Sequence, residues 1–463
     1  MNTVCSLVDN SFLNDVNLVR ELGRGTYGSV YLVQKPNGIQ FAIKYMYNDN
    51  NGILKSSLLD IDSILRLRNV PDVINAIGIC YQNNQIAFIL EAMDSDLFNF
   101  INITPVQERL KLTNKLLNTL INVTALMETL NITHFDIKPQ NVLVRRSNNV
   151  MSNGLDITFK VTDFGLAKPK FGSNVIPNEE LYTIWYRPPE MLAGRNRSTF
   201  PIFAGDIWAI AITMLEFING IAPFQGDNID RMLFLIYVAV NPYIGINNQL
   251  QFNLANQNGA ITGNIDIRNL VPQKLTKQLD SAIVNMLSRM LTLNPNQRPT
   301  GTQLMHEFNG SINPDFLTTL YPPIYSRRIH ESALEIIIKV GSNLKLSKAT
   351  ILIAIEIFTR YLDMIEIDLS VYSKALSSLQ IAVKYAEEDL FDLSRIGIAY
   401  QLVCGSKCNN MVMQEKDILT KIGFQIYNLN LSQVIERAYS KNIDLTKISL
   451  NQFAEPLTYW LID

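Results

Sequence analysis

A glycine-rich segment near the start of the chain has the spacing Gly-x-Gly-x-x-Gly, formed by Gly23, Gly25 and Gly28. Glycines let a backbone approach phosphate oxygens closely, and the exposed N–H groups donate hydrogen bonds to them. The same spacing also occurs in dinucleotide-binding loops and in plain turns. A strand-like run, 30–33, follows it instead of a helix, and no acidic residue lies at the ribose-binding distance, so we exclude the dinucleotide-binding loop.

A series of charged side chains and one amide, Asn141, follows this loop along the chain. Lys44 lies within a strand-like run, and the segment 134–141 has the pattern His-x-Asp-x-Lys-x-x-Asn. Alone, each residue has an ordinary structural explanation, such as a surface lysine or an aspartate in a turn. Together, in this order, they are hard to obtain by chance and indicate one functional site. The series after Lys44 is Asp136, Lys138, Asn141, Asp163, Glu190, Asp206 and Arg298.

Two kinds of element must position these residues. Alternating apolar and polar side chains predict a strand hairpin over 18–47, apolar residues at helical spacing predict a helix over 53–68, and short apolar runs predict strands over 72–92. From residue 97 onward helical patterns dominate. Residues 309–328 contain Gly, Pro and paired Arg and predict a linker, after which the pattern is helical again.

The composition limits the possible classes of protein. The chain has 463 residues, 47% of them hydrophobic and 18% charged, with a formal net charge of −2. This excludes disorder throughout and predicts two or three domains of about 100–200 residues each. Because there is no basic excess, we expect no nucleic-acid partner. There is no signal-peptide pattern and no run of roughly 18 apolar residues, so we expect a soluble intracellular protein with no membrane partner.

The cysteines do not indicate a structural or metal-binding framework. Cys5, Cys80, Cys404 and Cys408 are too few and too scattered for a set of disulfides. Cys404 and Cys408 could begin a metal site, but no second pair of ligands lies nearby, so we expect none.

The ordered motifs resemble a eukaryotic-type protein kinase over roughly residues 15–312. This resemblance implies an α+β bilobal fold, with an antiparallel sheet lobe at 1–93 and a helical lobe at 94–312. It also implies ATP and Mg²⁺ as cofactors, because phosphoryl transfer depends on positioning and charge neutralisation.

The resemblance gives each site residue an expected role. Lys44 would hold the α- and β-phosphates, Asp163 and Asn141 would carry Mg²⁺, Asp136 would accept the proton of the substrate hydroxyl, and Lys138 would neutralise the γ-phosphoryl group. Thr183 joins the catalytic set, and Glu190 and Arg298 would form a structural ion pair. Leu90 would be the gatekeeper, with Glu91 and Met93 offering backbone groups to adenine. The remaining nucleotide-binding residues would be Gly23, Gly25, Gly28, Val30, Ala42, Asp60 and Leu143.

Two segments resemble the cyclin-dependent branch of the family. They are Gly-Thr-Tyr-Gly at 25–28 and Thr-Ile-Trp-Tyr-Arg-Pro-Pro-Glu at 183–190. Lys138-Pro139, after the predicted catalytic aspartate, resembles the sequence of Ser/Thr kinases at this place. Arg187 resembles the arginine of those kinases that prefer proline after the phosphoacceptor. Thr26 and Tyr27 match inhibitory phosphorylation sites of this branch, with plain loop structure as the alternative.

The chain departs from the branch at the partner of the lysine, at the threonine that is phosphorylated on activation and at the arginines that bind its phosphate. Asp60 stands where a helix Glu pairs with the lysine, with Asp62 as second candidate, and Asn178 stands at the activating threonine. The three arginines that bind its phosphate are replaced by Phe135, Leu59 and Lys168. Since buried arginines without a phosphate partner would be costly, we expect activation without phosphorylation of this segment. A decayed, inactive kinase is the alternative.

The C-terminal helices resemble a cyclin box. The matching strings are Thr-Arg-Tyr-Leu at 359–362, Ile-Ala-x-Lys-Tyr-x-Glu at 381–387 and Glu-x-x-Ile-Leu-x-x-Ile-x-Phe at 415–424. The resemblance implies an all-α cyclin box at 329–435, after a linker at 313–328 and before a helical tail at 436–463. It also implies that Lys384 and Glu415 clamp the backbone at the small-lobe helix of the kinase.

The combined resemblance predicts a Ser/Thr protein kinase that is activated by its own cyclin box. A linker of some 15–20 residues raises the effective concentration to about the millimolar range, with docking in cis or in trans both open. One alternative is an impaired kinase–cyclin scaffold that recruits host cell-cycle proteins, and another is a cyclin box that drives a separate kinase. A kinase and a cyclin box fused in one asparagine-rich chain suggest a large DNA virus or a protist as the source, and for a virus the place of action would be the host cytoplasm or nucleus.

Overall fold

The computed structural model describes the chain with gaps. The described residues are 6–7, 10–25, 28–49, 52–68, 70–82, 85–147, 156–169, 182–194, 201–241, 263–308, 330–365, 370–387, 391–404, 411–424, 426, 429–441 and 444–445. Thr26, Tyr27, Asn178, Cys5, Cys408 and the expected linker lie outside them. The chain divides into two compact units, the first comprising Met1–Arg68, Asn75–Ala92 and Asn313–Asp463, the second Asn69–Ile74 and Met93–Ile312.

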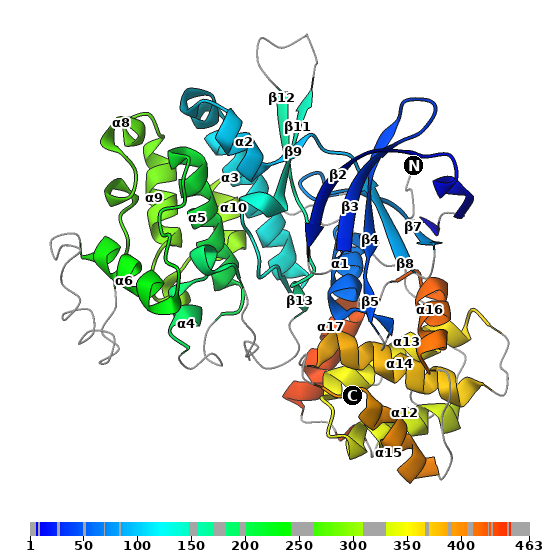
Figure 1. The fold of residues 1–463 in the computed structure, drawn as a ribbon. Coiled ribbons are helices and arrows are strands. Elements are labelled where there is room, and N and C mark those ends of the chain that lie inside the picture. The colour runs from blue at the N-terminus through cyan, green and yellow to red at the C-terminus, as the bar shows by residue number, and fades with distance from the viewer. Residues whose placement is uncertain are drawn as a thin grey trace. The chain divides into compact units, whose positions relative to one another are not determined.

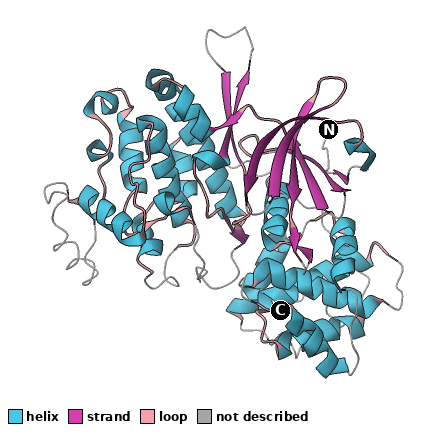
Figure 2. Cartoon of the chain, viewed as in Figure 1, coloured by secondary structure: helices cyan, strands magenta, loops and turns pink. Residues whose placement is uncertain are grey.

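The first unit contains a twisted sheet with the strand order β1-β7-β8-β4-β3-β2 (Figures 1 and 2). Its neighbours are antiparallel except for β1, which pairs in parallel with β7. One face of the sheet is apolar and packs with Leu13, and Ile43, Ala87 and Ile89 on this face are fully buried. The strands are β1 (Ser6–Leu7), β2 (Asn17–Gly25), β3 (Gly28–Gln34), β4 (Gln40–Met46), β7 (Ala76–Gln82) and β8 (Gln85–Glu91), beside the short helix η1 (Asn10–Leu13) and the hairpin β5 (Asn48–Asp49) with β6 (Gly52–Ile53).

Helix α1 (Lys55–Arg66) follows this hairpin and is buried along nearly its whole length. Its buried side chains include the charged residues Asp60, Asp62 and Arg66. Charged groups in such a position require partners, because an unpaired buried charge is strongly unfavourable. Those partners connect α1 to the sheet and to the C-terminal helices of the same unit.

The C-terminal helices of the first unit surround α13, as its apolar sequence predicts. Every residue of α13 from Ala349 to Leu362 is buried, and Ser347 caps its start by accepting a hydrogen bond from the Thr350 N–H. The helix packs against α14 and α17. The helices are α12 (Glu331–Asn343), α13 (Lys348–Leu362), α14 (Val371–Ala386), α15 (Ser394–Cys404), α16 (Met411–Lys421) and α17 (Leu429–Ser440).

The second unit is mainly helical, and α5 lies at its centre. All residues of α5 from Ala204 to Ile218 are buried, and it packs against α3 and α9 (Figure 1). The helices are α2 (Leu97–Ile103), α3 (Val106–Thr129), α4 (Pro189–Leu192), α5 (Ala204–Asn219), α6 (Ile229–Val240), α8 (Gln273–Thr276), α9 (Ser281–Met290) and α10 (Gly301–Glu307), with the short turns η2 (Pro139–Asn141), η3 (Ile184–Tyr186), η5 (Ile267–Asn269) and η6 (Pro295–Gln297).

Short strands within the second unit flank the loops that carry predicted site residues, and these strands were not expected from its helical pattern. A three-stranded sheet has the order β12-β11-β9, and a second pair is formed by β10 and β13. These strands bracket the segments that carry Asp136, Asn141 and Asp163. Their bounds are β9 (Ser95–Asp96), β10 (Ile132–Thr133), β11 (Val142–Ser147), β12 (Asp156–Val161) and β13 (Lys168–Pro169).

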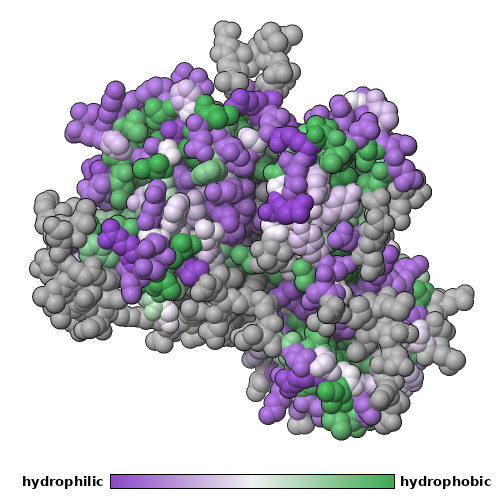
Figure 3. All heavy atoms as spheres, viewed as in Figure 1, coloured by the Kyte–Doolittle hydropathy of each residue, from purple (hydrophilic) through white to green (hydrophobic). Residues whose placement is uncertain are grey.

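The face shown in Figure 3 mixes hydrophilic and hydrophobic patches. Large apolar side chains that are exposed, such as Ile103, Ile221 and Leu402, belong to different elements of the fold. Scattered residues of this kind are ordinary on protein surfaces. Among the described residues, no helix has the length and apolar character needed to span a membrane.

Candidate active site

Three of the residues predicted to be catalytic surround the carboxylate of a fourth, Asp136. Asn141 Nδ2 donates to Asp136 Oδ2 at 3.0 Å, and Lys138 Nζ lies 2.7 Å from the same oxygen. Thr183 donates to Asp136 Oδ1 through its hydroxyl at 3.0 Å and its backbone N–H at 3.3 Å. Lys138 Nζ also donates to Thr183 Oγ1 at 2.9 Å. Both carboxylate oxygens are thereby held in fixed directions, while the catalytic roles of these residues stay predictions.

The loop that carries Asp136 has a backbone conformation that side chains rarely adopt. Phe135 has a φ of 63°, in the left-handed region, which costs about 1–3 kcal/mol for a residue with a side chain. The buried Asp206 sustains this conformation by accepting hydrogen bonds from the N–H groups of His134 at 2.7 Å and Phe135 at 3.1 Å. Such strain is concentrated at functional sites, where the surrounding structure fixes one geometry.

Asn141 and Asp163 offer oxygen atoms that suit Mg²⁺. Asn141 donates its amide nitrogen to Asp136 O at 2.8 Å and Oδ2 at 3.0 Å, which turns its amide oxygen away from that carboxylate. Asp163, with a φ of 61°, follows Thr162, whose N–H donates to Asn141 O at 3.0 Å. Across the described ranges there is no cluster of three or more His, Cys, Asp or Glu that could hold a metal. A pair of oxygen ligands fits Mg²⁺, which completes its shell with water and phosphate oxygens.

Lys44 and Asp60 form a close ion pair within the first unit. Lys44 lies on β4, and its Nζ is 2.7 Å from Asp60 Oδ2 of α1. Both side chains are largely buried, with exposed fractions of 14% and 2%. Asp60, and not the second candidate Asp62, therefore occupies the position beside the lysine. The shorter side chain reaches Lys44 without a gap in the ion pair.

The glycine-rich loop contains glycines of two kinds. A Cβ added at Gly28 would lie 3.3 Å from the Tyr45 carbonyl carbon and closer still to its oxygen, so Gly28 is required where β3 approaches β4. Among the described residues, a Cβ added at Gly23 or Gly25 would meet no atom within 4 Å. The packing of the described residues thus does not require glycine at positions 23 and 25, and a contact of these glycines with phosphate stays a prediction.

The remaining predicted nucleotide contacts are distributed over both units. In the first unit, Val30 pairs with Lys44 and Ala42 pairs with Leu90 across neighbouring strands. The Glu91 N–H donates to Asn75 O at 3.0 Å, and its carboxylate accepts from the Asn75 N–H at 2.8 Å. In the second unit, Met93 is buried, and Leu143 lies on β11 opposite Asp96 of β9 and Lys160 of β12.

Lys384 and Glu415, the predicted interface residues, meet at Ile53 just before α1. Lys384 Nζ lies 2.7 Å and 2.9 Å from the Glu415 carboxylate oxygens and donates to Ile53 O at 3.1 Å. Glu415 Oε2 accepts from the Ile53 N–H at 3.2 Å. Burial raises the pKa of Glu415, and Lys384 opposes that rise. The ion pair thus binds both polar groups of a single backbone residue.

A second group of contacts at α1 was missed from the sequence. Asp62 accepts from the Tyr385 hydroxyl at 2.6 Å and from the Ile426 N–H at 2.8 Å, and its Oδ2 lies 3.1 Å from Arg66 Nε. Lys55 Nζ donates to Glu387 O at 2.6 Å. The sequence shows Asp62 and Arg66 four residues apart, but this spacing is more typical of an ion pair on an exposed helix face, so it did not indicate a buried contact.

The segment 182–187, which follows the position of Asn178 in the sequence, is held by buried polar contacts. Tyr182 has a φ of 65°, and its carbonyl oxygen accepts from Arg187 at 3.0 Å and 3.3 Å. The Tyr182 hydroxyl donates to Asp206, and burial beside this carboxylate raises the Tyr182 pKa. The predicted ion pair of Glu190 and Arg298 is confirmed, with two contacts at 2.9 Å and 3.1 Å. No sequence motif pointed to Tyr182.

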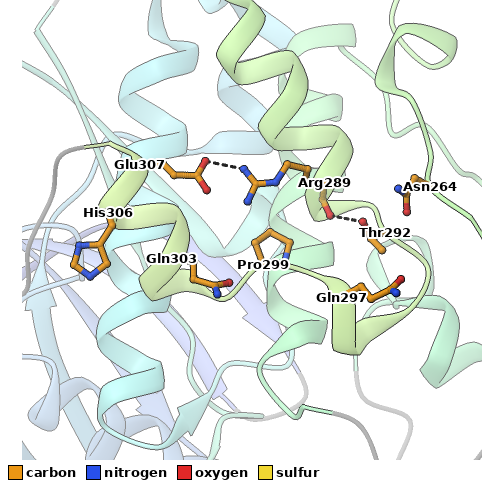
Figure 4. A pocket seen from close by; sticks show the side chains of 8 residues that line it. All are labelled: Asn264, Arg289, Thr292, Gln297, Pro299, Gln303, His306 and Glu307. Atoms are coloured by element: carbon orange, nitrogen blue, oxygen red, sulfur yellow. Dashed lines mark hydrogen bonds and ion pairs between the residues drawn. The ribbon is translucent and has the colours of Figure 1, made fainter.

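Two of the cavities formed by the described residues lie in the second unit. One of about 680 Å³ contains none of the predicted site residues, and its polar lining includes the Arg289–Glu307 ion pair at 2.8 Å (Figure 4). The other, of about 540 Å³, lies beside Thr183, between Ile184 and Arg187 on one side and the start of α6 on the other. Asp136 is not among the residues that line the second cavity, but Thr183, its hydrogen-bond partner, directly precedes the lining residue Ile184.

Comparison with known proteins supports two successive domains. The model of the protein kinase domain matches residues 16–308, and the model of the cyclin N-terminal domain matches residues 304–427. A chain in the crystal structure of the yeast RNA Pol II CTD kinase CTDK-1 complex is similar to this chain, with 21% sequence identity and a TM-score of 0.46. The similarity covers 64% of this chain and 97% of that one.

Proposed function

The chain belongs to the protein kinase family and carries a cyclin domain after its kinase domain, and from this premise we propose that it transfers the γ-phosphoryl group of ATP to Ser or Thr residues of proteins. The observation that carries the proposal is the set of contacts around Asp136, made by Lys138, Asn141 and Thr183. These contacts orient a carboxylate to accept the proton of a substrate hydroxyl.

The other residues have roles in binding ATP and Mg²⁺. Lys44, held by Asp60, would bind phosphate oxygens, and the backbone at Gly23 and Gly25 would approach them. Asn141 and Asp163 would hold Mg²⁺, which neutralises phosphate charge when it is bound. Lys138 supplies a further positive charge next to Asp136.

We propose that the preferred substrates have proline after the phosphoacceptor. The Tyr182 carbonyl oxygen already accepts two hydrogen bonds from Arg187 and is turned by a positive φ. Any other residue after the phosphoacceptor has a backbone N–H, which would lose its hydrogen bond to water on binding and could not bond to the Tyr182 oxygen instead. Proline has no N–H and therefore loses nothing. The cavity next to Ile184 offers space for its ring.

We propose that the cyclin domain of this chain activates the kinase domain. Lys384 and Glu415 hold Ile53 at the entrance to α1, the helix that carries Asp60. Fixing α1 from this end fixes the partner of Lys44. With Phe135, Leu59 and Lys168 where phosphate-binding arginines would stand, the arrangement favours activation without phosphorylation of the segment that contains Asn178.

The test is transfer from Mg-ATP to a Ser-Pro peptide library by phosphatase-treated, full-length protein. Wild type should transfer phosphate, while Asp163→Asn and the double variant Lys384→Ala/Glu415→Ala should not. A matched library with Ser-Ala in place of Ser-Pro should be a poorer substrate.

Failure of the wild type to exceed the Asp163→Asn background would contradict the proposal. The alternative would then be a scaffold that recruits host cell-cycle proteins. A shift of the thermal midpoint by Mg-ATP would then separate a scaffold that binds nucleotide from one that does not.

A further inference from the structure

Tyr182, the residue before Thr183, is held from both its side chain and its backbone. It is buried, its hydroxyl donates to Asp206 Oδ1 at 3.0 Å, and its N–H donates to Phe135 O at 2.9 Å. The edge of one ring faces the other in the pair Tyr182–Phe135, with centroids 5.6 Å apart. The residue that stands in place of the catalytic-loop arginine therefore packs directly against Tyr182.

Gly205 provides the space for the Tyr182 phenol. It lies in the first turn of α5, where glycine is less favourable than alanine. A Cβ at this position would lie 2.9 Å from Tyr182 Cζ and closer still to its hydroxyl oxygen. Gly205 thus allows the phenol to reach the carboxylate of the next residue.

Asp206 joins the two segments through one buried carboxylate. Its oxygens accept from the N–H groups of His134 and Phe135 in the catalytic loop, and from the hydroxyl of Tyr182. Thr183, the next residue, donates two hydrogen bonds to Asp136. Because Tyr182 and Thr183 are adjacent in the chain, fixing Tyr182 also fixes Thr183, which orients the predicted catalytic carboxylate of Asp136.

We propose that Tyr182 is a positioning residue that anchors the Thr183 segment to the catalytic loop, with Gly205 as the space it requires. The inference rests on the proposed kinase function and gives its phosphate-independent activation a physical basis. The neutral Tyr182 phenol binds the buried Asp206 carboxylate and packs against Phe135, and these contacts hold the Thr183 segment without any modification of the chain. No modifying enzyme is needed to form them.

The first test is Tyr182→Phe, which keeps the ring and removes the hydroxyl. We expect kcat for a Ser-Pro peptide to fall about ten- to a hundredfold, the change that corresponds to a hydrogen bond to a charged group. The KM for ATP should stay within about twofold, since the change is confined to the peptide side. Thr300→Ala is the control for lost stability alone, because it removes the side chain that caps α10 by accepting a hydrogen bond from the Gln303 N–H.

The second test measures coupling between Gly205 and Tyr182. Gly205→Ala should reduce kcat at least as much as Tyr182→Phe, because its methyl group displaces the phenol. In a Tyr182→Val background the same Gly205→Ala change should have little further effect. An equal loss in both backgrounds would show that Gly205 serves another purpose and would overturn the inference.

Hydrogen–deuterium exchange separates this inference from the proposed function. The amides of residues 183–187 should exchange faster in Tyr182→Phe than in wild type, in protein without nucleotide and whether or not wild type is active. Unchanged exchange together with unchanged kcat would refute the anchoring role. Faster exchange in a protein without kinase activity would support the anchor while the proposed function fails.

Discussion

At the scale of single residues, Asp60 shows how a substitution depends on its surroundings. The family resemblance implies a glutamate at this position, yet Asp60 Oδ2 lies 2.7 Å from Lys44 Nζ with only 2% of its side chain exposed. The placement of α1 compensates for the missing methylene group, so a longer side chain at this buried position would have to displace Lys44 or the helix.

We therefore predict that Asp60→Glu lowers stability instead of improving activity. Overpacking a buried site by one methylene group costs about 1–3 kcal/mol, which unfolding by heat or denaturant would measure. Asp60→Asn keeps the size but removes the charge, and should lower kcat/KM for ATP about tenfold or more. An Asp60→Glu variant that is both as stable as wild type and more active would contradict this account.

At the scale of elements, the Asp62–Arg66 pair ties α1 to the C-terminal helices. Arg66→Met leaves the buried Asp62 carboxylate without its cation and should destabilise the first unit by about 3–5 kcal/mol. Tyr385→Phe removes one hydrogen bond to the same carboxylate and should cost about 1–3 kcal/mol. Lys339→Met breaks an exposed i,i+4 pair with Glu335 and should cost about 0.3–0.5 kcal/mol. Equal losses in all three variants would show that burial of the network is unimportant.

The same elements show what periodicity can and cannot predict. The sheet, α1 and the buried helix α13 follow from the apolar pattern. The strands β11 and β12 were missed because they are short segments between long helices. Asp62 and Arg66 have the spacing of a solvated pair, and only tertiary packing reveals their burial. Tyr182 and Gly205 are 23 residues apart by their numbers in the sequence, so their fit depends on the folded chain.

At the scale of the whole molecule, the kinase and cyclin domains share one chain, which makes their pairing independent of dilution if it occurs in cis. A short tether provides an effective concentration of about the millimolar range. We predict that the specific activity of the full-length protein stays constant over a thousandfold dilution, roughly from micromolar to nanomolar enzyme. A progressive loss on dilution would indicate pairing between chains.

A mixing experiment distinguishes pairing in cis from pairing in trans more directly. Asp163→Asn keeps the cyclin contacts but loses a predicted Mg²⁺ ligand, whereas Lys384→Ala/Glu415→Ala keeps the predicted catalytic residues but loses the contacts to Ile53. If each cyclin domain binds the kinase domain of its own chain, an equimolar mixture stays as inactive as the two variants alone, because the competent cyclin domain is already occupied. Restored activity, rising with total protein concentration, would mean that the cyclin domain of one chain activates the kinase domain of another.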